Sequence, residues 1–323
     1  MREELKRRRL AYTWKLMLLV FLTVGTGVMY QFINVRMKYF DMIMKLRAPK
    51  LVVIIIVAFC IGCATIIFQT LINNTIVTPC LLGMNSLYIL VHTMVVFLLG
   101  TSSIYVKNNQ VAFIVDLVIM TVVAMILYGY LFQKTGGNIL YILLAGTVMA
   151  TLFTSITSTV QRMMSPNDFA TLETTLIASF SNVNTKIIGI AVILTAIVLV
   201  LFRKDIRQLD VISLGRNQAI NLGVDYDRVL RRLLIAVTIL ISIATAMVGP
   251  ISFLGLIIAN IGRQLFKTYK HSILILGTTL IGAVMLLAGQ SVIEHVLTYS
   301  ATISTFITIG GGAYFLFLIM RDK

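Results

Sequence analysis

Side chains that could carry chemistry are few in this sequence and lie far apart. The three histidines, His92, His271 and His295, fall at different expected depths of an apolar chain, so a metal site built from them is not expected. Cys60 and Cys63 form a C-x-x-C pair with no second pair and no nearby histidine, which favours ordinary packing thiols over a zinc site. We expect this chain to bind no metal and no other cofactor.

Sequence motifs of enzymes do not occur either. The phosphate-binding pattern G-x-x-x-x-G-K-[ST] is missing, so the chain is not expected to hydrolyse ATP, and H-E-x-x-H and G-x-S-x-G are missing too. Intramembrane carboxylates mark ion-coupled carriers, and only Asp116 and Glu294 qualify here, each near the outer end of its expected span. An ion-coupled secondary transporter is therefore one alternative, whereas an enzyme has no supporting motif. If the chain transports a solute, we expect the energy to come from another polypeptide.

The composition is that of an integral membrane protein. Of the 323 residues, 59% are hydrophobic and 12% are charged, and the mean hydropathy is +0.96, whereas about a quarter of residues are charged in soluble domains. The net charge of +15 fits basic loops held in the cytoplasm better than it fits nucleic-acid binding, which is not expected. We predict an all-α, multi-pass protein with a single transmembrane domain over residues 1–323, in contact with membrane lipid.

Apolar runs separated by polar interruptions predict about ten membrane segments. The run at 251–261 is too short to cross a hydrocarbon layer about 30 Å thick, so the stretch from Gly249 to Gly262 is expected to form a re-entrant or half-length helix. Such helices are tolerated inside protein or beside a water-filled cavity, as in transporters. The expected segments are 14–33, 49–72, 82–99, 111–132, 139–160, 187–202, 233–248, 251–261, 272–292 and 303–320.

The distribution of basic residues orients these segments. With both termini in the cytoplasm, 19 of the 27 Lys and Arg residues lie inside and eight lie outside, in agreement with the positive-inside rule. One short outer segment opposes the rule, which indicates an acidic partner, anionic lipid headgroups or simple tolerance of charge there. Its five basic residues are Arg36, Lys38, Lys45, Arg47 and Lys50.

The largest polar stretch on the inner side covers residues 203–232. It mixes apolar and charged residues and contains Gly215 and Gly223. We predict a short amphipathic helix from about Arg216 to Leu222, ended by Gly223. This helix either lies on the lipid headgroups or forms a compact projection that engages a cytoplasmic partner.

Several motifs occur in the order found in one transporter family. Residues 46–50, LRAPK, are similar to L-R-x-P-R, and residues 69–83, QTLINNTIVTPCLLG, are similar to Q-x-x-x-x-N-P-L-A-D-P-x-x-L-G. Residues 143–146 match L-L-A-G, residues 214–224 match L-G-x-x-x-A-x-x-L-G-V, and residues 249–257 match G-P-I-x-F-[VL]-G-L-[IV]. The chain thus resembles the FecCD-type permeases, the BtuC-like membrane subunits of ABC importers for iron–siderophore complexes, haem and vitamin B12.

The departures from the family pattern bear on the substrate. The first proline of the second motif is missing, Thr78 replaces its acidic residue, and Ala259-Asn260 stands where Pro-His is common. These variants are more similar to the siderophore members, particularly those for catecholate siderophores, than to the vitamin B12 permeases. A haem or vitamin B12 permease of the same fold is the alternative.

The resemblance implies a subunit of the bacterial plasma (inner) membrane that works as a pair, with a second copy or a related chain. Its other partners would be cytoplasmic ABC ATPase subunits, which use the ATP and Mg²⁺, and an extracellular or periplasmic siderophore-binding protein. Arg47 and Lys50 hold the positions that meet carboxylates of that binding protein. The segment that couples to the ATPase would comprise Gly215, Arg216, Asn217, Gln218, Ala219, Leu222, Gly223 and Val224.

The family pathway would be lined by small and polar residues of the second, fifth and eighth spans. Because a siderophore already chelates its iron, the pathway needs no iron ligands. Residues 135–138 are expected to form a cytoplasmic gate, or else an ordinary tight turn. The candidates for path or gate are Gln69, Asn73, Asn74, Pro79, Gly83, Thr135, Gly136, Gly137, Asn138, Thr147, Thr151, Ser155, Gly249, Pro250 and Gly255.

Overall fold

The computed structural model describes residues 2–33, 39–100, 103–135, 139–180, 185–298 and 301–321. These residues form helices and connecting turns, and none of them lies in a strand. Helices satisfy their backbone hydrogen bonds internally, which lipid requires of a spanning segment. The predicted all-α class is confirmed.

The helices follow one another with short connections. We call the π-helical turn η2 and number the α-helices in chain order. Their bounds are α1 (Arg2–Phe32), α2 (Phe40–Ile72), η2 (Cys80–Met84), α3 (Asn85–Leu99), α4 (Ile104–Lys107), α5 (Asn109–Thr135), α6 (Ile139–Met163), α7 (Pro166–Leu176), α8 (Thr185–Leu201), α9 (Arg203–Ile212), α10 (Arg216–Asn221), α11 (Tyr226–Val248), α12 (Leu254–Phe266), α13 (His271–His295) and α14 (Ile303–Arg321).

Seven of the described helices are long and apolar enough to cross a membrane. The number is eight if α8 and α9, which meet at a bend of 57°, form one span. The apolar helices Leu254–Phe266 and Ile303–Phe317 are shorter. At 1.5 Å per residue, the 13 residues of α12 reach only about 20 Å, as expected for a half-length helix. Each of the ten expected segments therefore coincides with a helix, while the number of crossings stays a prediction.

Helix α2 extends beyond the membrane segment expected there. The apolar run predicts a second segment over 49–72, whereas α2 begins at Phe40 and contains Pro49. Proline inside a helix leaves the carbonyl four residues earlier without its helix bond, here that of the exposed Lys45. Leaving this carbonyl without its helix bond costs least near the end of a helix, where other polar groups can bond to it. Helix α2 can therefore extend beyond its apolar part.

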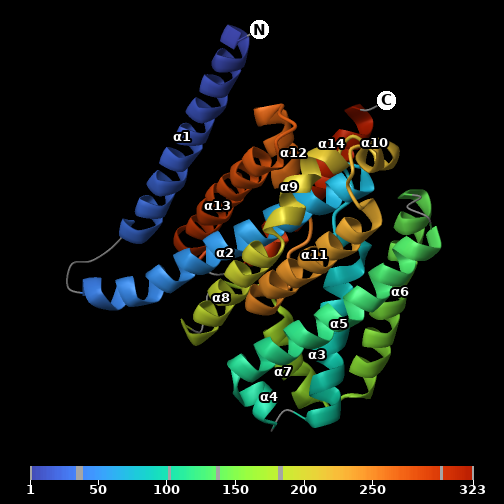
Figure 1. Cartoon of the computed structure of the whole chain (residues 1–323). Helices are drawn as coiled ribbons and strands as arrows, with labels where there is room; N and C mark the ends of the chain where they lie inside the picture. The colour runs from blue at the N-terminus through green and yellow to red at the C-terminus, as the bar shows by residue number, and fades with distance from the viewer. Residues whose placement is uncertain are drawn as a thin grey trace.

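The helices pack around α2, which lies between α11 and α13 (Figure 1). On one side α1 packs mainly against α13, and on the other α5 packs on α11 while α3 and α6 pack together. The start of α1, the end of α14 and α10 lie at one end of the molecule, and α4 and α7 lie at the opposite end (Figure 1). We call these the α10 end and the α7 end.

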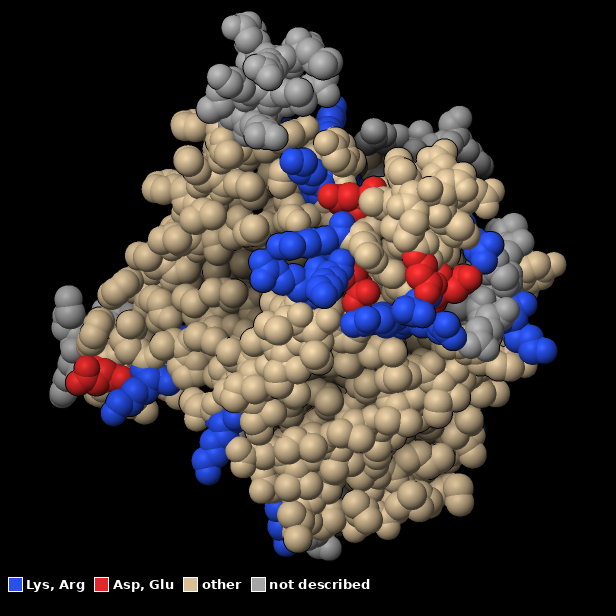
Figure 2. Space-filling model, in the orientation of Figure 1, with Lys and Arg blue, Asp and Glu red and all other residues tan. Residues whose placement is uncertain are grey.

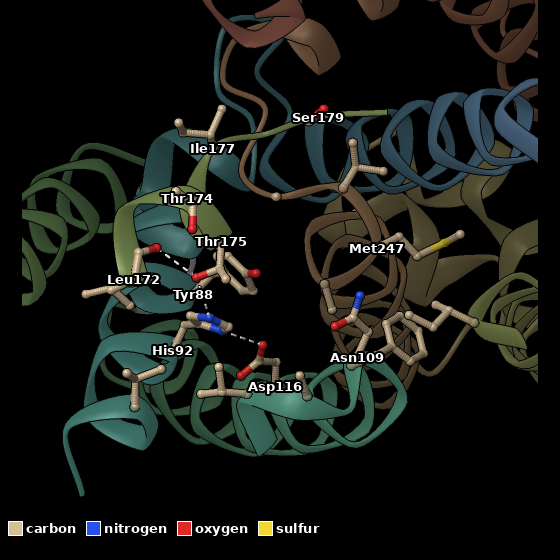
Figure 3. Close-up of a pocket in the computed structure, with 18 of the residues that line it drawn as sticks. Tyr88, His92, Asn109, Asp116, Leu172, Thr174, Thr175, Ile177, Ser179 and Met247 are labelled. Carbon is tan, nitrogen blue, oxygen red and sulfur yellow. Dashed lines mark hydrogen bonds and ion pairs between the residues drawn. The ribbon is translucent and has the colours of Figure 1, made fainter. Parts of the chain in front are cut away.

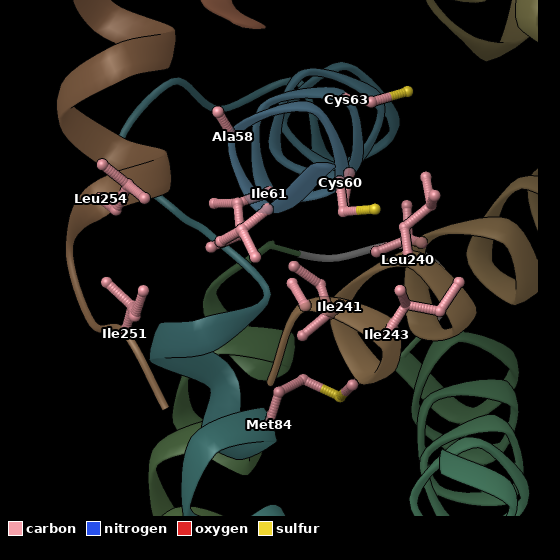
Figure 4. Close-up of a cluster of buried hydrophobic side chains, with 14 of the residues drawn as sticks. Ala58, Cys60, Ile61, Cys63, Met84, Leu240, Ile241, Ile243, Ile251 and Leu254 are labelled. Atoms are coloured by element: carbon pink, nitrogen blue, oxygen red, sulfur yellow. The ribbon is translucent and has the colours of Figure 1, made fainter. Parts of the chain in front are cut away.

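The core consists of aliphatic side chains with small residues between close helices (Figure 4). Cys60 and Cys63 are fully buried among them, in agreement with packing thiols. A Cβ added at Gly255 of α12 would lie 2.3 Å from Thr65 Oγ1 of α2, so only glycine permits this approach. Small residues matter here because helices in lipid associate through close packing.

Charge is concentrated at the α10 end. In Figure 2, Lys, Arg, Asp and Glu side chains gather in the upper half of the view, and the surface below them is mostly uncharged. Many large apolar side chains are exposed, such as Phe21 of α1 and Val200 of α8. An apolar belt of this kind suits contact with lipid.

Candidate functional site

The predicted short helix is present at the α10 end. Helix α10 runs from Arg216 to Asn221 between two glycines whose φ angles are +98° at Gly215 and +83° at Gly223. Residues other than glycine rarely adopt such φ angles, so the two glycines set where the helix begins and ends. The predicted short helix is confirmed to within a residue.

Helix α10 is anchored by Ala219 and Arg216, and three apolar residues in or beside it are exposed. Ala219 is fully buried, and the guanidinium of Arg216 lies 3.0 Å from the carboxylate of Asp227 in α11. Around the helix, 52% of Leu214, 45% of Ile220 and 63% of Leu222 are exposed. We call these three residues the α10 patch. An apolar patch at the charged end of the molecule is suited to contact with another protein.

A polar cluster joins the end of α2, the loop at 73–79 and α12. Gln69 donates from Nε2 to the carbonyl of Thr75 at 2.6 Å and accepts from Arg263 Nε at 3.2 Å. Asn260 donates to the same carbonyl at 3.2 Å, and Asn74 accepts from the backbone of the residues two and three further on. These bonds hold the loop at 73–79, which carries the second sequence motif.

The candidates from α6 lie apart from this cluster. Thr147, Thr151 and Ser155 are exposed and follow one another at intervals of four residues, so they share one face of α6. Gln69 is 1% exposed and points to the loop at 73–79 instead. The structure therefore does not bring Gln69 together with these three residues of α6.

Two glycines of the candidate set have structural roles. Gly83 permits the contact between η2 and α6, and Gly249 begins the break after α11. Gly83 has φ +97°, and a Cβ there would lie 3.2 Å from the Cβ of Ala150 in α6. Gly249 has φ +93°, and a Cβ there would lie 2.9 Å from Ala178 Cα. Pro79 is buried, Pro250 is partly exposed and Asn73 closes α2 with φ +52°.

The predicted cytoplasmic gate is only partly described. Gly136, Gly137 and Asn138 lie outside the described residues, and Thr135 is the last residue of α5. The gate stays a prediction.

At the α7 end, the two predicted docking residues make contacts within the chain. Lys50 Nζ lies 2.9 Å from Glu294 Oε1, with side-chain exposures of 10% and 5%. Tyr30 and Gln290 also donate to Glu294 Oε1, each at 2.9 Å. Lys50 is thus the partner of a buried carboxylate rather than a freely presented charge, which the sequence reasoning missed.

Arg47 is less enclosed but also has partners. Its Nη1 donates to the carbonyls of Tyr30, Gln31 and Ile33 at 3.1, 3.0 and 2.9 Å, and its Nη2 lies 3.3 Å from His295 Nε2. These bonds close the last turn of α1 against α2 and α13. The docking role of both residues stays a prediction.

A second buried pair lies beside a cavity of about 230 Å³ at the α7 end (Figure 3). Asp116 accepts from Tyr105, and its Oδ2 is 2.8 Å from His92 Nδ1. His92 Nε2 lies 3.1 Å from the hydroxyl of Thr175 in α7. Asp116, like Glu294, has partners in the fold and is not an isolated intramembrane carboxylate. Among the described residues no cluster of three or more His, Cys, Asp or Glu could hold a metal.

Residues 11–321 match the FecCD transport family. The chain belongs to this family. It is 41% identical over 283 residues to the petrobactin import system permease protein YclO of Bacillus subtilis, covering 88% of this chain and 90% of the relative. It is 32% identical over 281 residues to the petrobactin import system permease protein FatC of Bacillus anthracis, covering 87% and 79%.

A solved structure supports the same fold. A metal-chelate-type ABC transporter in an inward-facing conformation has a TM-score of 0.79 and 21% identity, covering 96% of this chain and 99% of the other. FecCD proteins are transport components rather than enzymes, so the expectation of no catalytic role for this chain is confirmed.

The pairs that the sequence reasoning missed join residues far apart in this FecCD chain. Lys50 and Glu294 are 244 residues apart, and His92 and Asp116 are 24 residues apart on different helices. The only signal was that the two carboxylates lay in apolar runs, where an ionised group needs a partner. Nothing in the spacing identified that partner.

The Lys50–Glu294 pair predicts a specific pattern of stability. Removing one charge from a buried pair leaves the other uncompensated, so Lys50→Met and Glu294→Gln should each lower the free energy of unfolding by about 3–5 kcal/mol. The double variant should lose less than the sum of the two. Thermal unfolding of the detergent-solubilised protein measures this. The control is Lys45→Met, because Lys45 is exposed on the same helix. Additive losses in the double variant would contradict the prediction.

Proposed function

We propose that this chain is the permease subunit of an ATP-driven ABC importer that moves an iron(III)–siderophore complex, of the catecholate type, into the cytoplasm. The observation that carries the substrate class is the 41% identity to a petrobactin import permease over nearly the whole chain. The haem and vitamin B12 permeases that also match are 26% identical, which makes such substrates the second candidate.

The proposed arrangement has ten spans in a single permease domain over residues 1–323, with both termini and the coupling segment 203–232 in the cytoplasm. Its support is that the start of α1, the end of α14 and α10 lie at the same end of the molecule, where charge is concentrated (Figures 1 and 2). The proposed location is the bacterial plasma membrane. The positive-inside rule then assigns the α10 end to the cytoplasm.

The proposed partners are two cytoplasmic ABC ATPase subunits, a second permease subunit and a siderophore-binding protein on the outer side. ATP and Mg²⁺ belong to the ATPases, and this chain binds no cofactor. Closure of the ATPases around ATP would move α10, because nucleotide biases one of two states and α10 carries that difference to the permease. The exposed stripe of Thr147, Thr151 and Ser155 on α6 would face the pathway between the two permeases.

Uptake into proteoliposomes tests the substrate. The complex of this chain with its ATPase, a permease partner and the binding protein should accumulate a ferric catecholate siderophore only when ATP is inside. Haem and cyanocobalamin, each with its own binding protein, are the comparison. Uptake of either of these in place of the siderophore would reject the proposed substrate, and uptake without ATPase would reject the importer.

The α10 patch predicts the effect of a single charge on ATPase binding. Leu222→Asp would place a carboxylate in an apolar contact, where desolvation is costly, and should weaken association with the ATPase at least about tenfold, or ~1.4 kcal/mol. Co-purification and titration in detergent measure this. Val296→Asp is the control, because Val296 is 72% exposed at the other end of the molecule. Equal effects of the two substitutions would contradict the coupling role.

Docking of the binding protein predicts a salt-dependent contact at Arg47. Arg47→Gln should weaken association of the binding protein by about fivefold, or ~1 kcal/mol, at low ionic strength, with the difference shrinking as salt is added. Lys45→Gln is the control for loss of an outer charge on the same helix. Lys50 is the poorer test because its charge is paired with Glu294. An unchanged affinity in Arg47→Gln would remove this residue from the docking site.

A further inference from the structure

Helix α9 ends on a bond that crosses to α13. Asp210 lies in the last turn of α9, five residues before Gly215, where the turn to α10 begins. Its Oδ1 accepts from the backbone N–H of His271 at 2.9 Å and lies 2.6 Å from the ring Nδ1 of the same residue. His271 is the first residue of α13. Two bonds to one carboxylate oxygen therefore tie the segment that holds α10 to the start of α13.

The other edge of the same imidazole contacts α2. His271 Nε2 lies 2.9 Å from Thr70 Oγ1, and the Thr70 hydroxyl donates to the carbonyl of Ile66 at 2.8 Å. His271 is 3% exposed and Thr70 is 7% exposed. Polar contacts shielded from water in this way are stiffer than apolar contacts, since breaking one leaves buried groups without partners.

Thr70 follows Gln69 in the sequence, and Gln69 holds the loop at 73–79. Gln69 is bonded to the carbonyl of Thr75 and to Arg263 of α12, so α2, α12 and this loop form one bonded unit. The loop continues into η2, which packs directly against α6. A Cβ at Gly146 of α6 would lie 2.5 Å from Leu82 Cδ2, so η2 is unable to shift toward α6 without displacing it.

We propose that His271 is a positioning residue that links α10 to the transport pathway. Through Asp210 on one side and Thr70 on the other, it passes a displacement of α10 to the loop at 73–79 and from there to α6. The inference rests on the proposed function, because it assigns the internal link between ATPase and pathway. Spatial continuity alone does not prove coupling, so the test must measure coupling itself.

Two substitutions divide the link into its halves. In His271→Asn the side-chain amide takes the place of Nδ1, so the bond to Asp210 is kept and the bond to Thr70 is lost. In His271→Gln the longer amide takes the place of Nε2, so the bond to Thr70 is kept and the side-chain bond to Asp210 is lost. Each variant is assembled with the ATPase, the permease partner and the binding protein in proteoliposomes. The measured quantity is the amount of ferric siderophore transported per ATP hydrolysed.

Both variants should still bind the ATPase and hydrolyse ATP, while transport per ATP falls at least about fivefold, the lower range of coupling between sites. Asp210→Ala should give the same loss, and it is the second variant in case His271 substitutions impair folding, because 38% of the Asp210 side chain is exposed. Thr268→Ala is the control, since the Thr268 hydroxyl accepts from the backbone N–H of Lys270, just before α13. It should transport normally.

The outcomes separate the link from a capping role and from the proposed function. If His271 served only to hold the start of α13 through Asp210, His271→Asn would transport normally per ATP, and this result overturns the link. An unchanged ratio in both variants overturns it as well. Failure of the wild-type complex to take up siderophore with ATP would instead reject the proposed function on which the inference rests.

Discussion

Two polar contacts between α2 and α13 set the frame for the rest of the molecule. Lys50 pairs with Glu294 at the α7 end, and Thr70 pairs with His271 at the α10 end. The contacts lie 20 residues apart along α2 and thus about 30 Å apart at 1.5 Å per residue, the thickness of a hydrocarbon layer. Lipid supplies no partner for these groups, so each contact fixes the register of the two helices at one membrane surface.

The remaining helices are arranged against this pair. Between the two contacts α2 is buried along almost its whole length, with α11 on one side and α12 fitted closely at Gly255. The break after Gly249 shortens α12, which leaves Asn260 and Arg263 level with the end of α2 and able to hold the loop at 73–79. The second sequence motif therefore contacts residues of α12 although they are nearly 200 residues apart.

The same frame changes how the outer basic cluster is understood. Its charge opposes the positive-inside rule, and an acidic partner was one of the expected explanations. Glu294 of the chain itself is such a partner for Lys50, and backbone carbonyls at the end of α1 occupy Arg47. Part of the cluster thus stabilises the fold, and Arg47, which is more accessible than Lys50, is the better candidate of the two for the proposed contact with a binding protein.

The sequence alone determined the helical class, the ten apolar segments and the short helix between Gly215 and Gly223, because composition, periodicity and glycine positions act locally. Its motifs indicated the family by resemblance. It did not show that His271 contacts Asp210 and Thr70, that Glu294 pairs with Lys50, or that Gln69 turns away from the α6 stripe. These contacts join residues 61 to 244 positions apart. Only tertiary packing decides them, because a buried polar group in lipid accepts whichever partner the neighbouring helix places within reach.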